Sequence, residues 1–304
     1  AYWAAHQPTP VVLPPLDLTV RALADIALVT PNPTGAETLK GNILKAIPSY
    51  GGKAANYAVL FNTPGLPVRK AFGIPVYYYD KFMRDNGFFA RVDAMLADST
   101  FRTDPGTRDA MLAQLRTDMI AAPMDPQFEA DLAAKVAAGF ADVTKLKFRS
   151  SSNSEDLSAF PCAGCYDSFG GLVTDLADMS RAVRQTWASV WSFRGFELRS
   201  YYSVDHKSVG MAILAHQAFV GESSNGVAVT ANPFDPSGLD PAFYINVQAG
   251  EDAEVVSPPP GVSSDQFLYY YSQPNQPISF LAHSNLISAG TTVLSTAQTY
   301  QLGM

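Results

Sequence analysis

Hydrophobic residues recur with a helical period in the first half of the chain. Phe128, Leu132 and Val136 are spaced every fourth residue, and Asp125-Pro126 in front of them supplies an N-cap followed by a proline at the first helical position. This spacing predicts an amphipathic helix that ends near Gly139.

Shorter segments around this helix predict turns and a strand. Residues 49–53 form a glycine turn that leads into a helix-prone run. Residues 73–79 predict a short strand, which Pro75 places at a sheet edge or a strand start. The first 35 residues are rich in proline and show no sustained period, so we interpret them as an extended arm or linker with a short helix near residues 20–26.

The second half changes from a helical period to strands. A long helix is predicted from about Leu176 to Tyr202, and its broad apolar side carries Val183, Trp187, Val190, Trp191 and Leu198. Strands are predicted at residues 147–151, 209–217, 226–230, 243–247 and 266–271. Helices concentrated early and strands concentrated late predict an α+β fold with a mostly antiparallel sheet.

Composition excludes several classes of protein. Apolar residues make up 47% and charged residues 16% of the 304 residues, which indicates a globular chain with a full core. A net charge of −7 without a run of basic residues argues against a nucleic-acid partner. No apolar stretch is long enough to span a membrane.

Because the start lacks both Met and a signal-peptide pattern, we expect a processed or trimmed product. The low charge content points to an extracytoplasmic location.

Cys162 and Cys165 are the two cysteines of the chain, with two residues between them. A single C-x-x-C pair lacks the ligand count of a structural zinc site and the surroundings of a thioredoxin-like motif. A short-loop disulfide and two independent thiols both remain open. A disulfide would add to the indication of an extracytoplasmic location.

Gly51, Gly52 and Lys53 are the first candidate for phosphate chemistry. Glycines let backbone amides approach phosphate oxygens, and the lysine behind them supplies a mobile positive charge. The segment does not match the Walker-type P-loop. Taken alone, it is more typical of a helix-entry turn with a solvated lysine.

Residues 148–157 and 163–169 carry the second candidate, F-R-S-S-S-N-S-E-D-L and A-G-C-Y-D-S-F. Arg149, at a strand end, can clamp phosphate oxygens, while the hydroxyl-rich turn adds neutral donors. A polar loop with Glu155 near a helix start would explain each half separately. Together the two halves resemble the R-S-S-x-x-x-E-D-L and A-G-x-x-[ED]-[ST]-F segments of the ATP-binding domain of pyruvate phosphate dikinase and phosphoenolpyruvate synthase.

Further segments follow in the order of that family. Residues 50–56 resemble its G-G-K-x-x-[NS] motif, residues 73–76 its G-[IV]-P-V strand and residues 187–202 a helix ending in A-x-x-Y-R. Residues 216–220 stand where the family has V-Q-x-M-V, residues 226–233 where it has G-V-x-F-T-R-N-P, and residues 244–252 where it has I-N-A-Q-G-E-D. The resemblance therefore covers residues 50–252.

The resemblance implies a fold and a set of site residues. The fold would be ATP-grasp-like, with two subdomains around a nucleotide cleft, formed by residues 36–304 after an arm of residues 1–35. ATP phosphates would be held by Lys53 and Arg149 next to Gly51 and Gly52, and a magnesium ion by Glu251. The adenine would meet the hinge made of Gln217, Ala218, Phe219 and Val220. These parts suit phosphoryl transfer, which requires positioning and neutralised charge.

The chain also departs from the family pattern. Ala231 replaces the arginine of T-R-N-P, and a glutamine expected after Glu251 has no match. We expect the family's last acidic strand to lie beyond Met304, and a phosphohistidine domain to act in trans or elsewhere in a longer chain. The first hypothesis is an ATP-dependent phosphotransferase domain that is incomplete on its own. The alternatives are a nucleotide-binding module without turnover and a secreted structural domain.

Overall fold

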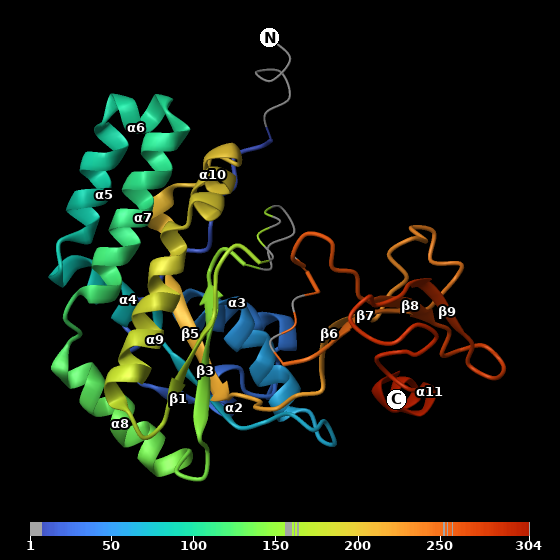
Figure 1. Ribbon diagram of the computed structural model, residues 1–304. Coiled ribbons are helices and arrows are strands. Elements are labelled where there is room, and N and C mark those ends of the chain that lie inside the picture. The colour runs from blue at the N-terminus through green and yellow to red at the C-terminus, as the bar shows by residue number, and fades with distance from the viewer. Residues whose placement is uncertain are drawn as a thin grey trace. The chain divides into compact units, whose positions relative to one another are not determined.

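The computed structural model describes residues 8–155, 160, 162, 164–251, 253, 255–256 and 258–303 (Figure 1). The chain forms two compact units, residues 1–218 and residues 219–304. Each unit contains one antiparallel sheet, which confirms the α+β fold with antiparallel strands. None of the helices in the described part is both long and apolar enough to cross a membrane.

The sheet of unit 1 has five strands in the order β1-β2-β5-β3-β4. Their bounds are Ala24–Asp25 for β1, Ala71–Ile74 for β2, Lys145–Ser152 for β3, Phe169–Leu172 for β4 and Met211–Gln217 for β5. The register places Lys147 opposite His216 and Arg149 opposite Leu214. Because side chains alternate along a strand, Lys147, Arg149 and Ser151 share one face of β3.

Helices cover both faces of this sheet (Figure 1). One face packs on α2 (Ile26–Val29) and α3 (Leu39–Asn62), where Leu214 is buried. The other face packs on a larger set of helices, with bounds α4 Val76–Asp85, α5 Phe88–Ala97, α6 Ser99–Thr103, α7 Pro105–Ala121, α8 Pro126–Gly139, α9 Leu176–Ala188 and α10 Phe193–Tyr201. Short 3-10 turns lie at η1 (Ser189–Trp191) and η2 (His206–Ser208).

The core of the helical layer is built around Trp187. Its ring lies 5.2 Å from Phe82 and 5.8 Å from Phe128, so α9 is joined to α4 and α8 by aromatic contacts. Phe128, Leu132 and Val136 are all buried in α8, as their spacing predicted. Asp125 caps this helix by accepting a hydrogen bond from Gln127 N at 3.0 Å.

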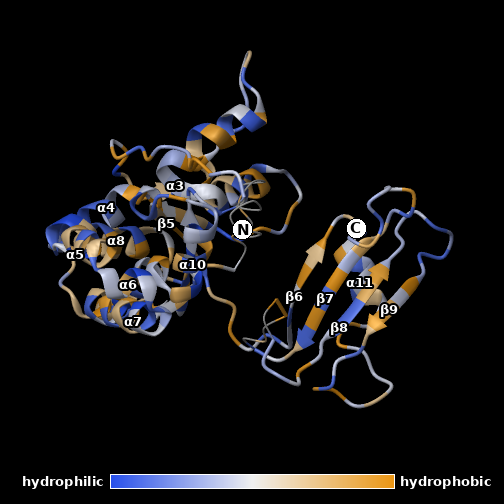
Figure 2. Ribbon diagram, turned by 90° about the horizontal axis from the view of Figure 1, so that it is seen from above, coloured by the Kyte–Doolittle hydropathy of each residue, from blue (hydrophilic) through white to orange (hydrophobic). Residues whose placement is uncertain are grey.

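Unit 2 is a four-stranded sheet with one helix. The strands β6 (Ser224–Val229), β7 (Phe243–Ala249), β8 (Asp265–Tyr269) and β9 (Ile278–Ala282) follow each other in chain order. The helix α11 (Thr296–Gly303) lies across one face of this sheet (Figure 2). The ring of Tyr300 on α11 is 5.7 Å from that of Tyr269, which fixes the helix to the apolar face.

Two predicted elements differ from the structure. The long helix of residues 176–202 is divided at Ser192, whose backbone is extended (φ −63, ψ 145) and whose hydroxyl caps α10 by accepting from Gly195 N. The strand predicted at residues 73–79 ends at Ile74, and residues 76–79 belong to α4. Pro75 is the N-cap residue of that helix, because proline lacks the N–H that a continuing strand would need.

From residue 8 onward, the N-terminal segment packs on the rest of unit 1. The short helix expected near residues 20–26 is misplaced, because β1 occupies Ala24–Asp25 and a four-residue helix begins only at Ile26. Leu13 is buried, and the carbonyl of Pro14 accepts a hydrogen bond from Asn153 at 2.8 Å. The domain boundary placed at residue 35 stays a prediction.

Candidate functional site

The helix α3 is interrupted where it meets strand β3. Gly51 has φ 73 and ψ 171, so the helical path breaks there and resumes afterwards. The hydroxyl of Ser151 fills this break, because it donates to the carbonyl of Tyr50 at 2.7 Å and accepts from the amide of Ala54 at 2.9 Å. One serine therefore supplies partners to backbone groups on both sides of the break.

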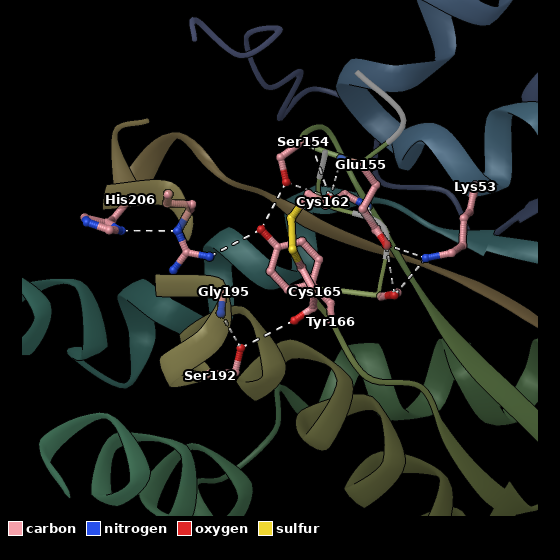
Figure 3. Close-up of a disulfide and its surroundings, with 12 residues drawn as sticks. Lys53, Ser154, Glu155, Cys162, Cys165, Tyr166, Ser192, Gly195 and His206 are labelled. Carbon is pink, nitrogen blue, oxygen red and sulfur yellow. Dashed lines mark hydrogen bonds and ion pairs between the residues drawn. A yellow bond between two sulfur atoms is a disulfide. The ribbon is translucent and has the colours of Figure 1, made fainter. Parts of the chain in front are cut away.

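This break sets the position of Lys53 at the start of the second half of α3. Its Nζ donates to Ser150 Oγ at 3.1 Å and forms an ion pair with Glu155 (Figure 3). The Lys53 side chain is 36% exposed, whereas that of Glu155 is 3% exposed. The ammonium group is thus bound by two protein side chains, and the Lys53 side chain remains partly accessible to solvent.

Glu155 is bound on both carboxylate oxygens. Oε2 accepts from the amide of Ser152 at 3.0 Å, and Oε1 accepts from Ser150 Oγ at 3.4 Å in addition to Lys53. The amide of Glu155 donates to Ser152 Oγ at 3.0 Å. The serines that follow Arg149 in the sequence therefore form a buried cradle for one carboxylate.

Arg149 lies on the α3 face of the sheet, near an imidazole. It is exposed on β3, and its positive charge acts on both Tyr57 of α3 and His216 of β5. The rings of Tyr57 and His216 are nearly parallel, with centroids 5.9 Å apart. The structure thus places basic, aromatic and imidazole side chains on the same face as the lysine-bearing helix.

His216 is held in its neutral form. Burial lowers the pKa of His216 to about 4, and the charges of Arg149 and Lys147 contribute in the same direction. Nδ1 lies 2.7 Å from the carbonyl oxygen of Gln217, so Nδ1 carries the hydrogen and donates it. Nε2 is consequently an acceptor, and it is buried with no hydrogen-bond partner in the described structure.

The predicted adenine hinge starts in unit 1. The carbonyl of Gln217 accepts from His216, and the amide of Ala218 donates to the carbonyl of Lys145 at 2.9 Å. Phe219 is 51% exposed and Val220 is 65% exposed. The two backbone groups thus have partners within the protein, and the two apolar side chains that follow are exposed.

Glu251 belongs to unit 2. It is exposed in the turn that follows β7, directly after Gly250, which has φ 108. Within the described residues no group of three or more His, Cys, Asp or Glu side chains is arranged to hold a metal ion. Magnesium commonly takes one or two protein carboxylates together with phosphate oxygens, so a single exposed glutamate fits that mode.

Sequence reasoning missed three contributors to this site. The sequence patterns give these residues no role of their own: Glu155 and Ser151 lie in the segment that resembles R-S-S-x-x-x-E-D-L, and His216 begins the segment that resembles V-Q-x-M-V. The available signal for Glu155 was its place in the E-D-L segment of the arginine motif. No local pattern indicates that Ser151 meets a residue that precedes it by about a hundred positions in the chain.

The two cysteines form a disulfide next to this cradle (Figure 3). Both are buried, and the zinc alternative is removed because both thiols are used. Tyr166 follows Cys165, and its hydroxyl lies 3.1 Å from Ser154 Oγ and 3.3 Å from Arg199 Nη1. The disulfide loop is therefore linked by hydrogen bonds to the segment that carries Glu155.

Comparison with known proteins gives one family and several relatives. Residues 47–291 match the family described as pyruvate phosphate dikinase, AMP/ATP-binding domain. The chain is 25% identical over 191 residues to a phosphoenolpyruvate synthase of Aeropyrum pernix, which covers 62% of this chain and 23% of that protein. It is 31% identical over 191 residues to a probable phosphoenolpyruvate synthase of Methanothermobacter thermautotrophicus, covering 60% of this chain and 27% of that protein.

A third relative has a name that gives a different activity. The chain is 27% identical over 186 residues to a rifampicin phosphotransferase of a Streptomyces species, covering 60% of this chain and 21% of that protein. The chain thus spans about a quarter of the length of the curated relatives it matches.

Proposed function

The chain belongs to the pyruvate phosphate dikinase family as its AMP/ATP-binding domain, and from this premise we propose that Lys53 and Arg149 hold the phosphates of ATP during phosphoryl transfer. The observation that carries the proposal is the set of hydrogen bonds that the ammonium group of Lys53 makes. Among the residues that the structure describes, two of its three N–H groups go to Ser150 and Glu155, which leaves one for a phosphate oxygen.

The backbone at this point also favours an anion. The second half of α3 starts after the break at Gly51, so its first amides lie at the positive end of a helix dipole. Arg149 adds a guanidinium group, which binds phosphate oxygens in a fixed geometry. Together these groups supply the charge neutralisation that phosphoryl transfer requires.

The remaining roles follow from the family pattern. Phe219 and Val220 offer exposed apolar surface for the adenine, next to Gln217 and Ala218. Glu251 is proposed as a ligand of Mg²⁺. When bound, this ion would supply positive charge that neutralises part of the charge of the phosphates.

The proposed reaction class is the transfer of a phosphoryl group from ATP to an acceptor outside this chain. Two relatives are named phosphoenolpyruvate synthases and one a rifampicin phosphotransferase, so their names give different acceptors. We propose a phosphohistidine domain, in trans or in a longer chain, as the first recipient. Retention of Lys53 and Arg149 supports an active phosphate site despite Ala231.

The test is ATP binding by Arg149→Ala, measured by calorimetry. We expect a loss of about 1.5 to 3 kcal/mol in ATP binding free energy, because one charge-assisted contact to phosphate is removed. Adenosine binding should stay unchanged. Arg102→Ala is the matched control, since Arg102 is an exposed arginine on α6. Equal ATP affinity in Arg149→Ala and the parent would refute the phosphate assignment.

A further inference from the structure

We propose that the carboxylate of Glu155 opposes the positive charge of Lys53. It thereby lowers the affinity of the site for nucleotides, and it does so more strongly for each additional phosphate. This inference rests on the proposed function, in which Lys53 contacts the phosphates. Glu155 would not touch the nucleotide. It would act through Lys53 and is therefore a positioning residue.

Burial prevents Glu155 from separating from Lys53. Its side chain is 3% exposed, and Lys53 is the cation that pairs with it among the described residues. A buried carboxylate that loses its cationic partner is strongly disfavoured. The ammonium group therefore keeps its ion pair with Glu155 when a ligand binds. A phosphate oxygen can then accept a hydrogen bond only from the remaining N–H of Lys53.

The cradle also keeps Glu155 in place. Its amide and one carboxylate oxygen are bonded to Ser152, at 3.0 Å each. Ser152 Oγ lies 3.0 Å from Ser154 Oγ, which in turn lies 3.1 Å from the hydroxyl of Tyr166. The negative charge thus has a fixed, buried position beside the ammonium group, whereas the Lys53 side chain is partly exposed (Figure 3).

This arrangement has an electrostatic consequence. The pair carries no net charge, so the attraction of Lys53 for a phosphate is opposed by the repulsion from Glu155. Each additional phosphate adds negative charge and so increases the repulsion that Glu155 exerts. Removal of the carboxylate charge should therefore strengthen binding most for ATP, less for ADP, still less for AMP and not for adenosine.

The experiment measures the dissociation constants of these four ligands for the parent chain and for Glu155→Gln. We expect ATP to bind on the order of tenfold more tightly to the variant, with the graded order given above. The gain should shrink as salt is raised, because screening weakens charge repulsion. Glu155→Asp keeps the charge and should bind the four ligands like the parent.

Two further variants keep the test decisive. Glu155→Ala removes the same charge without placing an amide in the cradle, and it should give the same graded order. Glu37→Gln makes the same change at a carboxylate that precedes α3 and pairs with Lys45, so no gain is expected. An equal change for all four ligands, or weaker ATP binding in both charge-removing variants, would overturn the proposal.

Lys53→Ala/Glu155→Gln separates this inference from the proposed function. If the double variant binds ATP as tightly as Glu155→Gln, Lys53 does not hold phosphates and the proposed function fails. If ATP binding falls in the double variant but Glu155→Gln shows no graded gain, only the counter-charge role fails.

Discussion

The carbonyl of Ser151 occupies the space that a side chain at Gly51 would need. A Cβ atom on Gly51 would lie 1.9 Å from Ser151 O, and Gly51 also has a positive φ of 73. Two independent constraints therefore require glycine at the position where α3 breaks and approaches β3.

Gly51→Ala should destabilise unit 1 strongly. We expect a loss of about 3 kcal/mol or more in the free energy of unfolding, because backbone strain and a clash with a main-chain oxygen add together. Denaturant unfolding measures this. Gly35→Ala is the control, since Gly35 has φ 59 but no atom within 4 Å of an added Cβ. Equal losses in the two variants would show that the contact with Ser151 contributes nothing.

Lys53→Ala should lower stability as well as nucleotide binding. The substitution leaves Glu155 buried without its cation, and we expect a cost of about 1 to 3 kcal/mol, reduced by the solvent access of Lys53. Adding Glu155→Gln should recover most of that stability, because the stranded charge is removed. Thermal or denaturant unfolding of the two single variants and the double variant measures the coupling. Additive losses would contradict a linked pair.

Stability should rise with pH between about 4 and 6.5. Burial lowers the pKa of His216 to about 4 from 6.5, so within this range the unfolded chain binds a proton that the folded protein excludes. The contribution is present above pH 6.5 and is lost as the pH falls toward 4, amounting to about 2 to 3 kcal/mol.

His216→Gln should flatten this dependence. A slope should remain, because burial also lowers the pKa of His206 to about 3. The measurement is the free energy of unfolding at several pH values. His283→Gln, at a histidine whose side chain is 62% exposed, serves as the control. An unchanged slope in His216→Gln would show that this imidazole is not the group responsible.

Glu251→Gln should reduce the gain in ATP affinity that Mg²⁺ provides. We expect a loss of roughly tenfold, or about 1.4 kcal/mol, because an amide oxygen is a weaker ligand for Mg²⁺ than a carboxylate. Calorimetry with and without Mg²⁺ measures the gain, and Glu222→Gln is a control in the same unit. An identical response to Mg²⁺ in parent and variant would remove Glu251 from the metal site.

The sequence by itself determined the elements whose signals are local. Asp125-Pro126 with the spacing of Phe128, Leu132 and Val136 was enough to place α8, because helix caps and helical periodicity act within a few residues. The ordered motifs around Lys53 and Arg149 were enough to indicate the family. Strand β9 and the helices α5, α6, α7 and α11 were not predicted, although the buried residues Phe88, Val92 and Met95 of α5 and Leu112, Leu115 and Met119 of α7 recur with helical spacing.

Only the tertiary structure decided how the site is assembled. Ser151 enters the break in α3, and Glu155 pairs with Lys53, across sequence separations of 101 and 102 residues. Such contacts depend on which faces of a helix and a strand meet when both bury their apolar sides. Periodicity within a segment shows that the segment has an apolar face, but it does not show which other element packs on that face. The pairing of Lys53 with the buried carboxylate of Glu155 is therefore found only in the folded chain.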